Sequence, residues 1–245
     1  PRSKEQKHES LCEGLIPLRA QDRVVARQYP GAAGNGVHVF VDYSNISISF
    51  VDSLKARLKL DKGDRFLPIP DINLEFLTEL MVRGRPIKVL NAGCSVHPHR
   101  PSPSFVNEFK ALGYRADVRQ RKLLEQATAP FIRPGGYSSD ENHATAKPRY
   151  VEDLVDETLQ TRIGESVMEY FQQPGTLIIA TGDAKPAQYS DGFFVYAERA
   201  LNMGWHVEVV SWKSSLSSMW KGTEFRAKWG DKFRLIELDP FLDDL

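Results

Sequence analysis

Short runs of β-branched and aliphatic residues alternate along this chain with longer segments whose apolar residues recur at helical spacing. The predicted strands are residues 37–42 (VHVFVD), 87–93 (IKVLNAG), 114–120 (YRADVRQ), 176–183 (TLIIATGD) and 205–212 (WHVEVVSW). The segments between them predict helices over 45–58, 71–84, 103–113, 151–171 and 191–204. Strands that alternate with helices are typical of βαβ units, so the pattern predicts an α/β fold with a mostly parallel sheet.

The ends of the chain and one internal segment depart from this alternation. Residues 1–35 are polar and close on YPGAAGNG, which predicts a partly ordered N-terminal arm ahead of a single domain over 36–245. The helix over 71–84 is expected to be capped by Asp71 and to end at Gly84. A last helix over 223–229 leads to an edge strand over 233–238. Residues 126–149 lack periodicity and predict a long loop that serves as a lid or contacts substrate.

Composition excludes several classes of protein. The 245 residues are 41% hydrophobic and carry 32 basic against 32 acidic side chains, which is typical of a globular domain and identifies no charged partner. No apolar run approaches the roughly 20 residues of a membrane span, so we expect no membrane association and an intracellular location, cytoplasmic or nuclear. Cys12 and Cys94 are too few for a disulfide scaffold or a cysteine-based zinc site, and both are interpreted as ordinary thiols.

Charge is unevenly distributed although its sum is zero. Residues 110–149 hold eight basic and four acidic side chains, and residues 212–234 hold six and two, with Trp212, Trp220 and Trp229 among them. Residues 152–169 hold six acids and only Arg162 as a basic residue. Basic flanks around an acidic centre suit an anionic polymer drawn to a metal-holding pocket, and solvated charged faces would give similar counts.

Two predicted strands end on aspartate. Asp42 closes VHVFVD and Asp183 closes TLIIATGD. If the first strand is central and the fourth its neighbour, both carboxylates meet at one edge of the sheet and repel each other unless a cation or protons intervene. Asp156 lies beside the apolar stripe of the 151–171 helix and is a third candidate. Each acid also has a structural interpretation: Asp42 caps the next helix, and Asp156 lies on a helix surface.

Other chemistries lack their motifs. A D-x-D phosphotransferase motif fails at Ser44, and the metal-adhesion pattern D-x-S-x-S fails at Ile46. GAAGNG precedes the first strand, where a dinucleotide fingerprint would follow it, and the sequence has neither a P-loop nor a G-x-S-x-G elbow.

The residues that remain resemble the NYN family of PIN-like ribonucleases. VFVDYSNI resembles the V-D-x-S-N strand end of that family, LVDETLQ its V-D-x-x-L helix, and LIIATGDA its [ST]-G-D strand end, in the same order. The resemblance covers about residues 37–212. It implies a three-layer α/β/α sandwich with a PIN-like sheet of five or six strands, and an acidic site that binds Mg²⁺ or Mn²⁺ and activates water to cut RNA, single-stranded RNA being the expected substrate.

The resemblance also implies roles for individual residues. Asp42, Asp156 and Asp183 match the catalytic acids: Asp42 and Asp183 hold the main metal, and Asp156 binds or orients its water. Asp191 is a further candidate ligand, although SDGFF is more simply a helix start that Asp191 caps. Substrate contact or support of the site is expected from Asn45, Ser44, Thr181, Lys185, Lys147 and Arg149.

One position departs from the family. The NYN pattern often has Asp or Asn two residues beyond the last acid, where this chain has Lys185. A lysine there either binds the scissile phosphate or takes the place of a second cation. Gly136, His143, His97 and His99 are further candidates for RNA contacts. The three tryptophans are candidates for base stacking, with packing in the core as the alternative.

Three hypotheses follow. The first is a metal-dependent endoribonuclease. The second is a catalytically inactive module of the same fold that binds RNA or protein. Protein partners, including further copies of the same chain, are compatible with these hypotheses. The third is a metal-dependent phosphohydrolase of small molecules, which would tolerate deletion of residues 127–146.

Overall fold

The centre of the molecule is a six-stranded sheet in which all neighbouring strands are parallel. The computed structural model describes residues 2–61, 63–99, 101–123, 150–151, 154–186 and 189–245. The strands lie in the order β3-β2-β1-β6-β7-β8. Their bounds are β1 Val37–Asp42, β2 Ile87–Val96, β3 Arg115–Gln120, β6 Thr176–Ala180, β7 His206–Ser211 and β8 Phe233–Glu237. The predicted α/β class and the parallel sheet are confirmed.

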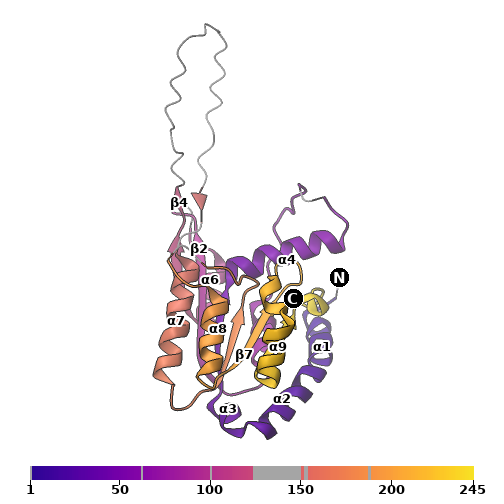
Figure 1. Ribbon diagram of the computed structural model, residues 1–245. Coiled ribbons are helices and arrows are strands. Elements are labelled where there is room, and N and C mark those ends of the chain that lie inside the picture. Colours follow the sequence, from indigo (N-terminus) through magenta and orange to yellow (C-terminus); the bar gives the residue numbers. More distant parts are fainter. Residues whose placement is uncertain (1, 62, 100, 124–149, 152–153, 187–188) are drawn as a thin grey trace, which may run out of the picture.

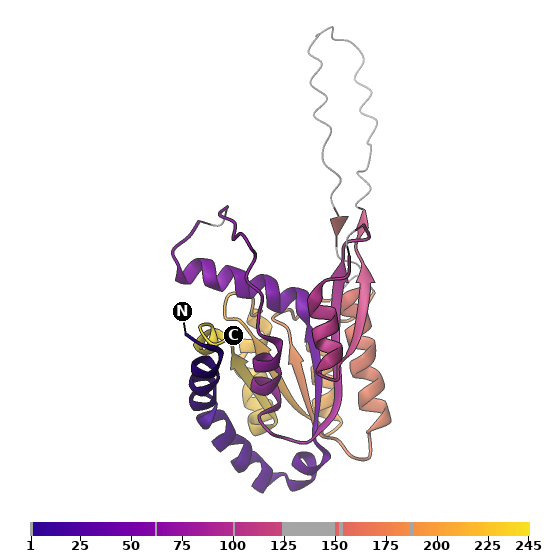
Figure 2. The ribbon, with the colours of Figure 1, turned by 180° about the vertical axis from the view of Figure 1, so that it is seen from behind.

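Helices cover both faces of the sheet and make three layers (Figures 1 and 2). One face carries α4 (Tyr43–Arg57), α5 (Leu74–Val82) and α6 (Ser104–Ala111), and the other carries α7 (Val155–Glu169), α8 (Phe193–Asn202) and α9 (Thr223–Trp229). Alternation along β1 feeds both cores, because Val39 and Val41 pack on the α5 side and Phe40 packs on the α7 side. None of the helices in the described part of the chain has the length and apolar character needed to cross a bilayer.

The first 35 residues form three helices, which corrects the prediction of a partly ordered arm. These are α1 (Lys4–Gly14), α2 (Ile16–Gln28) and α3 (Pro30–Asn35). They run along one side of the domain, from near the C-terminus to below the sheet (Figures 1 and 2). Leu11 and Leu15 are fully buried in the α5-side core, and this burial orders a segment whose sequence is otherwise polar. Residues 30–35 of YPGAAGNG are helical because Pro30 suits the first helical position, and Gly36, with φ +85°, follows the helix as its C-cap.

Several element ends differ from the predictions. Asn73, and not Asp71, caps α5, since its Oδ1 accepts a hydrogen bond from the backbone N–H of Phe76 at 3.1 Å. The helix predicted from residue 151 begins at Val155, because β5 (Tyr150–Val151) pairs with β4 (Lys122–Leu123) in an antiparallel ladder. Three short 3₁₀ helices follow β7: η1 (Ser218–Lys221), η2 (Gly230–Lys232) and η3 (Asp239–Phe241). The predicted loop over 126–149 lies outside the described residues.

A buried ionic cluster joins α2 to the sheet. The Arg83 guanidinium donates to Asp22 and to Glu208 at 2.7 Å each, Arg85 donates to Glu208 at 2.7 Å, and Arg234 bonds both carboxylates. Burial acts to raise the pKa of Glu208, but the three arginines outweigh it and hold that pKa well below its usual range. Glu208 is therefore a buried carboxylate that stays ionised because cations surround it.

Candidate functional site

The carboxyl ends of β1 and β6 flank the point where the strand order reverses. The sheet grows from β1 outward to β2 and β3, and then continues from β6, on the other side of β1, outward to β7 and β8. Open α/β sheets bind ligands in the crevice at such a switch point. Val41 is paired with Ala180, so Asp42 lies beside Thr181, which is two residues before Asp183 in the chain. The condition set in the sequence analysis is met, because the first and fourth predicted strands are β1 and β6, which are neighbours at the centre of the sheet.

Asp42 is buried and performs a structural task. It is the N-cap of α4: its Oδ1 accepts a hydrogen bond from the backbone N–H of Asn45 at 3.1 Å. Its Oδ2 accepts one from the Thr181 hydroxyl at 3.1 Å. An ionised carboxylate offers about four lone-pair sites, so capping a helix and binding a cation are compatible for one aspartate.

Thr181 connects Asp42, the last residue of β1, with Asp183. β6 ends at Ala180, so Asp183 lies in the turn three residues beyond the strand and not at its end, where the sequence predicts it. Its side chain is fully buried, and its hydroxyl donates to Asp42 and accepts a hydrogen bond from the backbone N–H of Asp183 at 3.2 Å. The Asn45 side chain adds a second tie, because its Oδ1 accepts a hydrogen bond from the Gly182 N–H at 2.9 Å. The start of α4 and the turn after β6 are thus held together by Thr181 and Asn45, two side chains that the sequence predicts to support the site.

The turn that carries Asp183 is held on its other sides as well. The Asp183 Oδ1 accepts a hydrogen bond from the backbone N–H of Lys185 at 2.9 Å, and its carbonyl accepts one from the Trp220 indole at 3.2 Å. A Cβ atom on Gly182 would lie 2.4 Å from the carbonyl oxygen of Ser215, so only glycine fits there. The Asp183 backbone is therefore fixed by its own turn and by the segment after β7.

Asp156 lies in the first turn of α7, at the same edge of the sheet. The helix packs closely on β2: a Cβ atom on Gly93 would lie 2.8 Å from the Leu159 side chain and 3.1 Å from Val155. Gly93 is the register partner of Asp42, which places the start of α7 beside the end of β1. Among the described residues, however, the oxygens of Asp42, Asp156 and Asp183 do not all lie within 4.8 Å of one another. The fold brings the three acids to one edge without closing them into a tight three-carboxylate cluster.

The other predicted residues fall into three groups. The Asp191 carboxylate accepts a hydrogen bond from Arg199 at 2.6 Å, and Gly192 occupies the N-cap of α8, so the prediction that Asp191 caps this helix is wrong. Ser44 is half-buried in the first turn of α4, and Lys185 is exposed beside Asp183. Four predicted residues lie outside the described part of the chain: Gly136, His143, Lys147 and Arg149.

The acids fit a hard divalent cation. Mg²⁺ prefers oxygen ligands, keeps several of its waters, and is commonly held by one or two carboxylates together with substrate phosphates. Asp42 and Asp183 would offer such an ion carboxylates from a hydrogen-bonded part of the fold, and Asp156 would offer a third from the neighbouring helix. A set of oxygen donors without thiol or imidazole suits Mg²⁺ or Mn²⁺.

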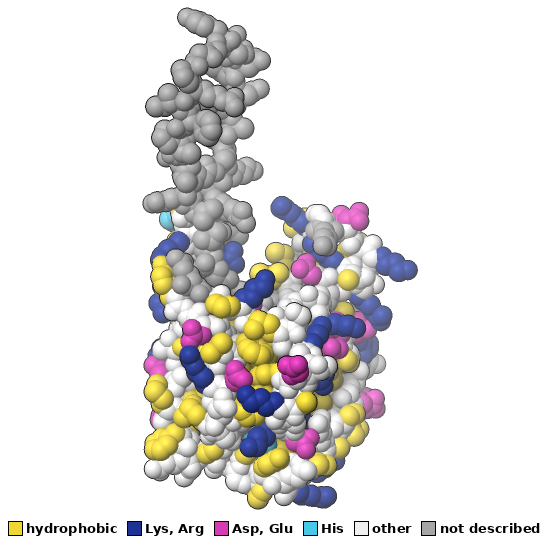
Figure 3. Space-filling model, viewed as in Figure 1, with side chains coloured by type: hydrophobic (Ala, Val, Ile, Leu, Met, Phe, Trp, Pro, Cys, Tyr) yellow, Lys and Arg dark blue, Asp and Glu magenta, His cyan; other side chains and the backbone are white. Residues whose placement is uncertain are grey.

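Basic side chains line the end of the sheet beyond β2. The Arg119 guanidinium donates to the Thr158 hydroxyl at 3.0 and 2.8 Å, and Arg121 donates to the Ser95 hydroxyl at 3.0 Å. His97 and His99 follow β2 at the same end. On the face drawn in Figure 3, basic and acidic side chains are interspersed, so no field of one sign covers the helices on that side.

The tryptophans belong mostly to the core. Trp212 and Trp220 are fully buried, and the Trp212 indole donates to the Ile46 carbonyl at 3.0 Å. The core interpretation is confirmed for both, and base stacking by them is excluded. Trp229 is partly buried on the α8 side of the sheet. The support that Trp220 gives to Asp183 was missed by sequence reasoning, because the two residues are 37 positions apart and no local pattern connects them.

Comparison of the chain with protein-family models, with curated proteins and with solved structures finds no match.

Proposed function

We propose that this protein is a metal-dependent endoribonuclease that hydrolyses RNA phosphodiester bonds at the carboxyl edge of its sheet. The observation that carries the proposal is the placement of Asp42 and Asp183 on either side of the switch point, joined through the buried Thr181 hydroxyl. The resemblance of the three acidic segments to the NYN family supports the same assignment.

The acids have separate roles in this proposal. Asp42 and Asp183 would hold Mg²⁺ or Mn²⁺, and the ion would supply a nucleophile by lowering the pKa of water and would neutralise charge on the phosphate. Asp156 orients the attacking water through its carboxylate. Lys185, exposed next to Asp183, binds a phosphate oxygen of the substrate.

Single-stranded RNA is the substrate class that we assign. Arg119 lies near the end of β3, Arg121 follows that strand and Lys122 begins β4, at the end of the sheet where the acids lie. These side chains suit a phosphate backbone that passes over this edge. Lys147 and Arg149 would add to this surface. An extended strand allows the scissile phosphate to reach carboxylates that are partly or fully buried.

The test separates the negative charge of Asp42 from its role as the N-cap of α4. Because asparagine caps helices about as well as aspartate, Asp42→Asn removes the charge and keeps the cap of α4. We expect Asp42→Asn and Asp183→Asn to retain the melting temperature and to lose cleavage of a labelled single-stranded RNA in Mg²⁺ or Mn²⁺. Asp243→Asn is the matched control, since that exposed acid pairs with Arg57 and has no role in the site, and it should cleave normally. Unchanged cleavage by both strand-end variants would refute the proposal.

A second candidate is an inactive module of the same fold that binds RNA. It is favoured by Lys185 in the position of a family acid and by the spread of the three carboxylates beyond 4.8 Å. It predicts salt-dependent RNA binding by the intact protein with no cleavage in either metal, and no change in binding for Asp183→Asn.

A further inference from the structure

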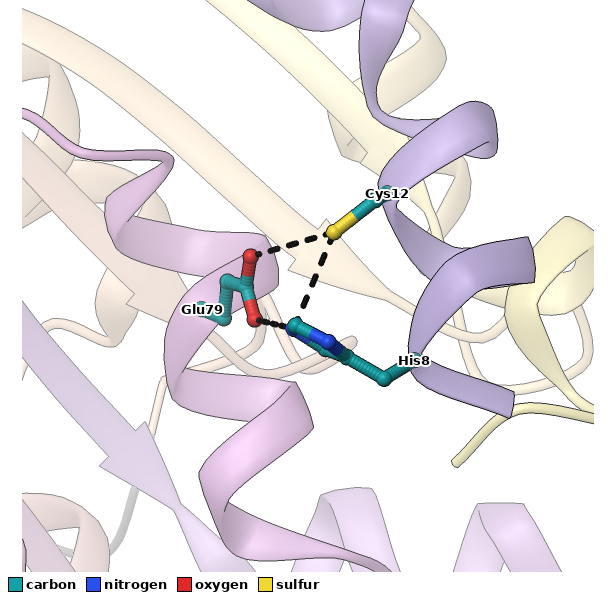
Figure 4. Close-up of side chains that lie close together, drawn as sticks. All are labelled: His8, Cys12 and Glu79. Atoms are coloured by element: carbon teal, nitrogen blue, oxygen red, sulfur yellow. Dashed lines mark hydrogen bonds and ion pairs between the residues drawn. The ribbon is translucent and has the colours of Figure 1, made fainter. Parts of the chain in front are cut away.

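A second group of metal-ligating side chains lies away from the sheet edge, between α1 and α5. His8 and Cys12 are four residues apart and therefore project from the same face of α1, toward Glu79 on α5 (Figure 4). One donor atom from each lies within 4.8 Å of the other two. The Cys12 Sγ is 3.7 Å from His8 Nε2 and 3.6 Å from Glu79 Oε1, and His8 Nε2 is 2.7 Å from Glu79 Oε2.

These separations are close to those of a tetrahedral zinc site. Zinc bonds of about 2.3 Å to sulfur and about 2.0–2.1 Å to nitrogen or oxygen put a sulfur about 3.6 Å from each of the other two ligands. Both sulfur distances agree with this value. Zinc bound through Glu79 Oε1 would require His8 to move, so that its Nε2 gives up the 2.7 Å hydrogen bond to the other carboxylate oxygen, Oε2, and lies about 3.3 Å from Oε1. His8 is 48% exposed and has room for that movement.

The surroundings of the group hold its members in place. The Glu79 Oε1 accepts a hydrogen bond from Arg19 at 3.0 Å, and the His8 ring stacks on Phe76 with ring centroids 5.2 Å apart. Leu11, between the two α1 ligands in the chain, is fully buried and fixes the rotation of the helix. Ligands placed on packed helices and bonded from outside are typical of built metal sites.

We propose that His8, Cys12 and Glu79 bind Zn²⁺, with a water as the fourth ligand, and that the ion fastens α1 to α5. A thiolate, an imidazole and a carboxylate together favour zinc or cobalt over Mg²⁺. Binding releases the thiol proton of Cys12 to solvent, and the thiolate and carboxylate balance the charge of the ion. This site is independent of the proposed nuclease centre, which uses oxygen ligands at the end of the sheet.

The test is titration of the full chain with Co²⁺ and Zn²⁺. Cobalt bound to a thiolate absorbs in the near ultraviolet, so the spectrum separates this site from a carboxylate site. We expect one equivalent of cobalt to produce the band, zinc to displace it, and zinc to raise the melting temperature. Cys12→Ser should remove the band and the thermal shift. His8→Ala and Glu79→Gln should each weaken zinc binding by about a hundredfold or more, beyond the loss typical of an outer-shell partner.

Matched controls keep the result specific. Cys94→Ala removes the other thiol, and Glu75→Gln removes the acid one turn earlier on α5, which pairs with Lys4. Both should keep the band, as should Asp42→Asn and Asp183→Asn. Absence of a thiolate band in the intact protein, or a band that survives Cys12→Ser, would overturn the proposal and would leave the Mg²⁺-dependent cleavage assay unaffected.

Discussion

His38 makes the stability of the domain depend on pH in a way that can be calculated. The residue lies on β1 and is fully buried, and its ring makes T-shaped contacts with the rings of Tyr170 and Trp205, with ring centroids 4.8 Å apart in each pair. Its Nδ1 is 2.6 Å from the Ser166 hydroxyl, and its Nε2 has no hydrogen-bond partner among the described residues. Burial, with a smaller effect of Lys88, lowers the pKa of His38 to about 4. The folded protein therefore keeps this ring neutral where the unfolded chain protonates it.

The magnitude follows from the two pKa values. With 6.5 in the unfolded chain and about 4 in the fold, the unfolded state binds more protons between these pH values. The contribution of His38 is thus fully present above pH 6.5 and is lost as the pH falls toward 4. Linkage gives a loss of about 2 kcal/mol between pH 7 and pH 5. Burial also lowers the pKa of His206 to about 4, with Lys232 and Arg234 adding to the effect, so His206 contributes a similar loss.

The assay is urea unfolding at pH 7 and pH 5. We expect the free energy of unfolding of the unaltered protein to fall by about 4 kcal/mol from the two histidines, and that of His38→Phe by about 2 kcal/mol. At pH 7 the variant should be less stable by about 1 kcal/mol, because the Ser166 hydroxyl loses its partner. His99→Ala, at an exposed position, is the control and should follow the unaltered protein. Equal losses for His38→Phe and the unaltered protein would refute the reasoning.

Substitutions at two further positions test the buried polar groups. Glu208→Gln should lower the free energy of unfolding by about 3–5 kcal/mol, because the three arginines are then left with Asp22 as their only buried carboxylate partner. Urea unfolding at pH 7 measures the change, and a change below about 1 kcal/mol would contradict this expectation. Thr181→Val should destabilise the fold by about 1–3 kcal/mol and reduce RNA cleavage, because Asp42 and Asp183 lose the hydroxyl that both of them bond. Thr181→Ser keeps a hydroxyl and should keep the cleavage rate. Equal cleavage rates for the two variants would exclude a positioning role for Thr181.

Local rules account for the parts of the structure that the sequence predicted. The alternation of apolar runs with helical stripes can be recognised within windows of about ten residues. The α/β class and all six sheet strands follow from it, the last strand from FRLIEL. The capping alternative for Asp42 was also a local inference, since a cap and its partner Asn45 are three residues apart. The same rules failed for residues 1–35, because buried contacts of Leu11 and Leu15 with distant helices decide whether that segment is ordered.

Tertiary structure alone decided which polar groups meet. The sequence placed Asp42 and Asp183 at strand ends, but only the strand order made those ends neighbours and put Thr181 between them. The indole that supports Asp183 comes from Trp220, after the next strand, and the partner of His8 and Cys12 comes from a helix more than sixty residues later. Such contacts depend on how helices and strands pack across the whole chain, and hydrophobic packing fixes that arrangement without leaving a pattern near the residues it brings together.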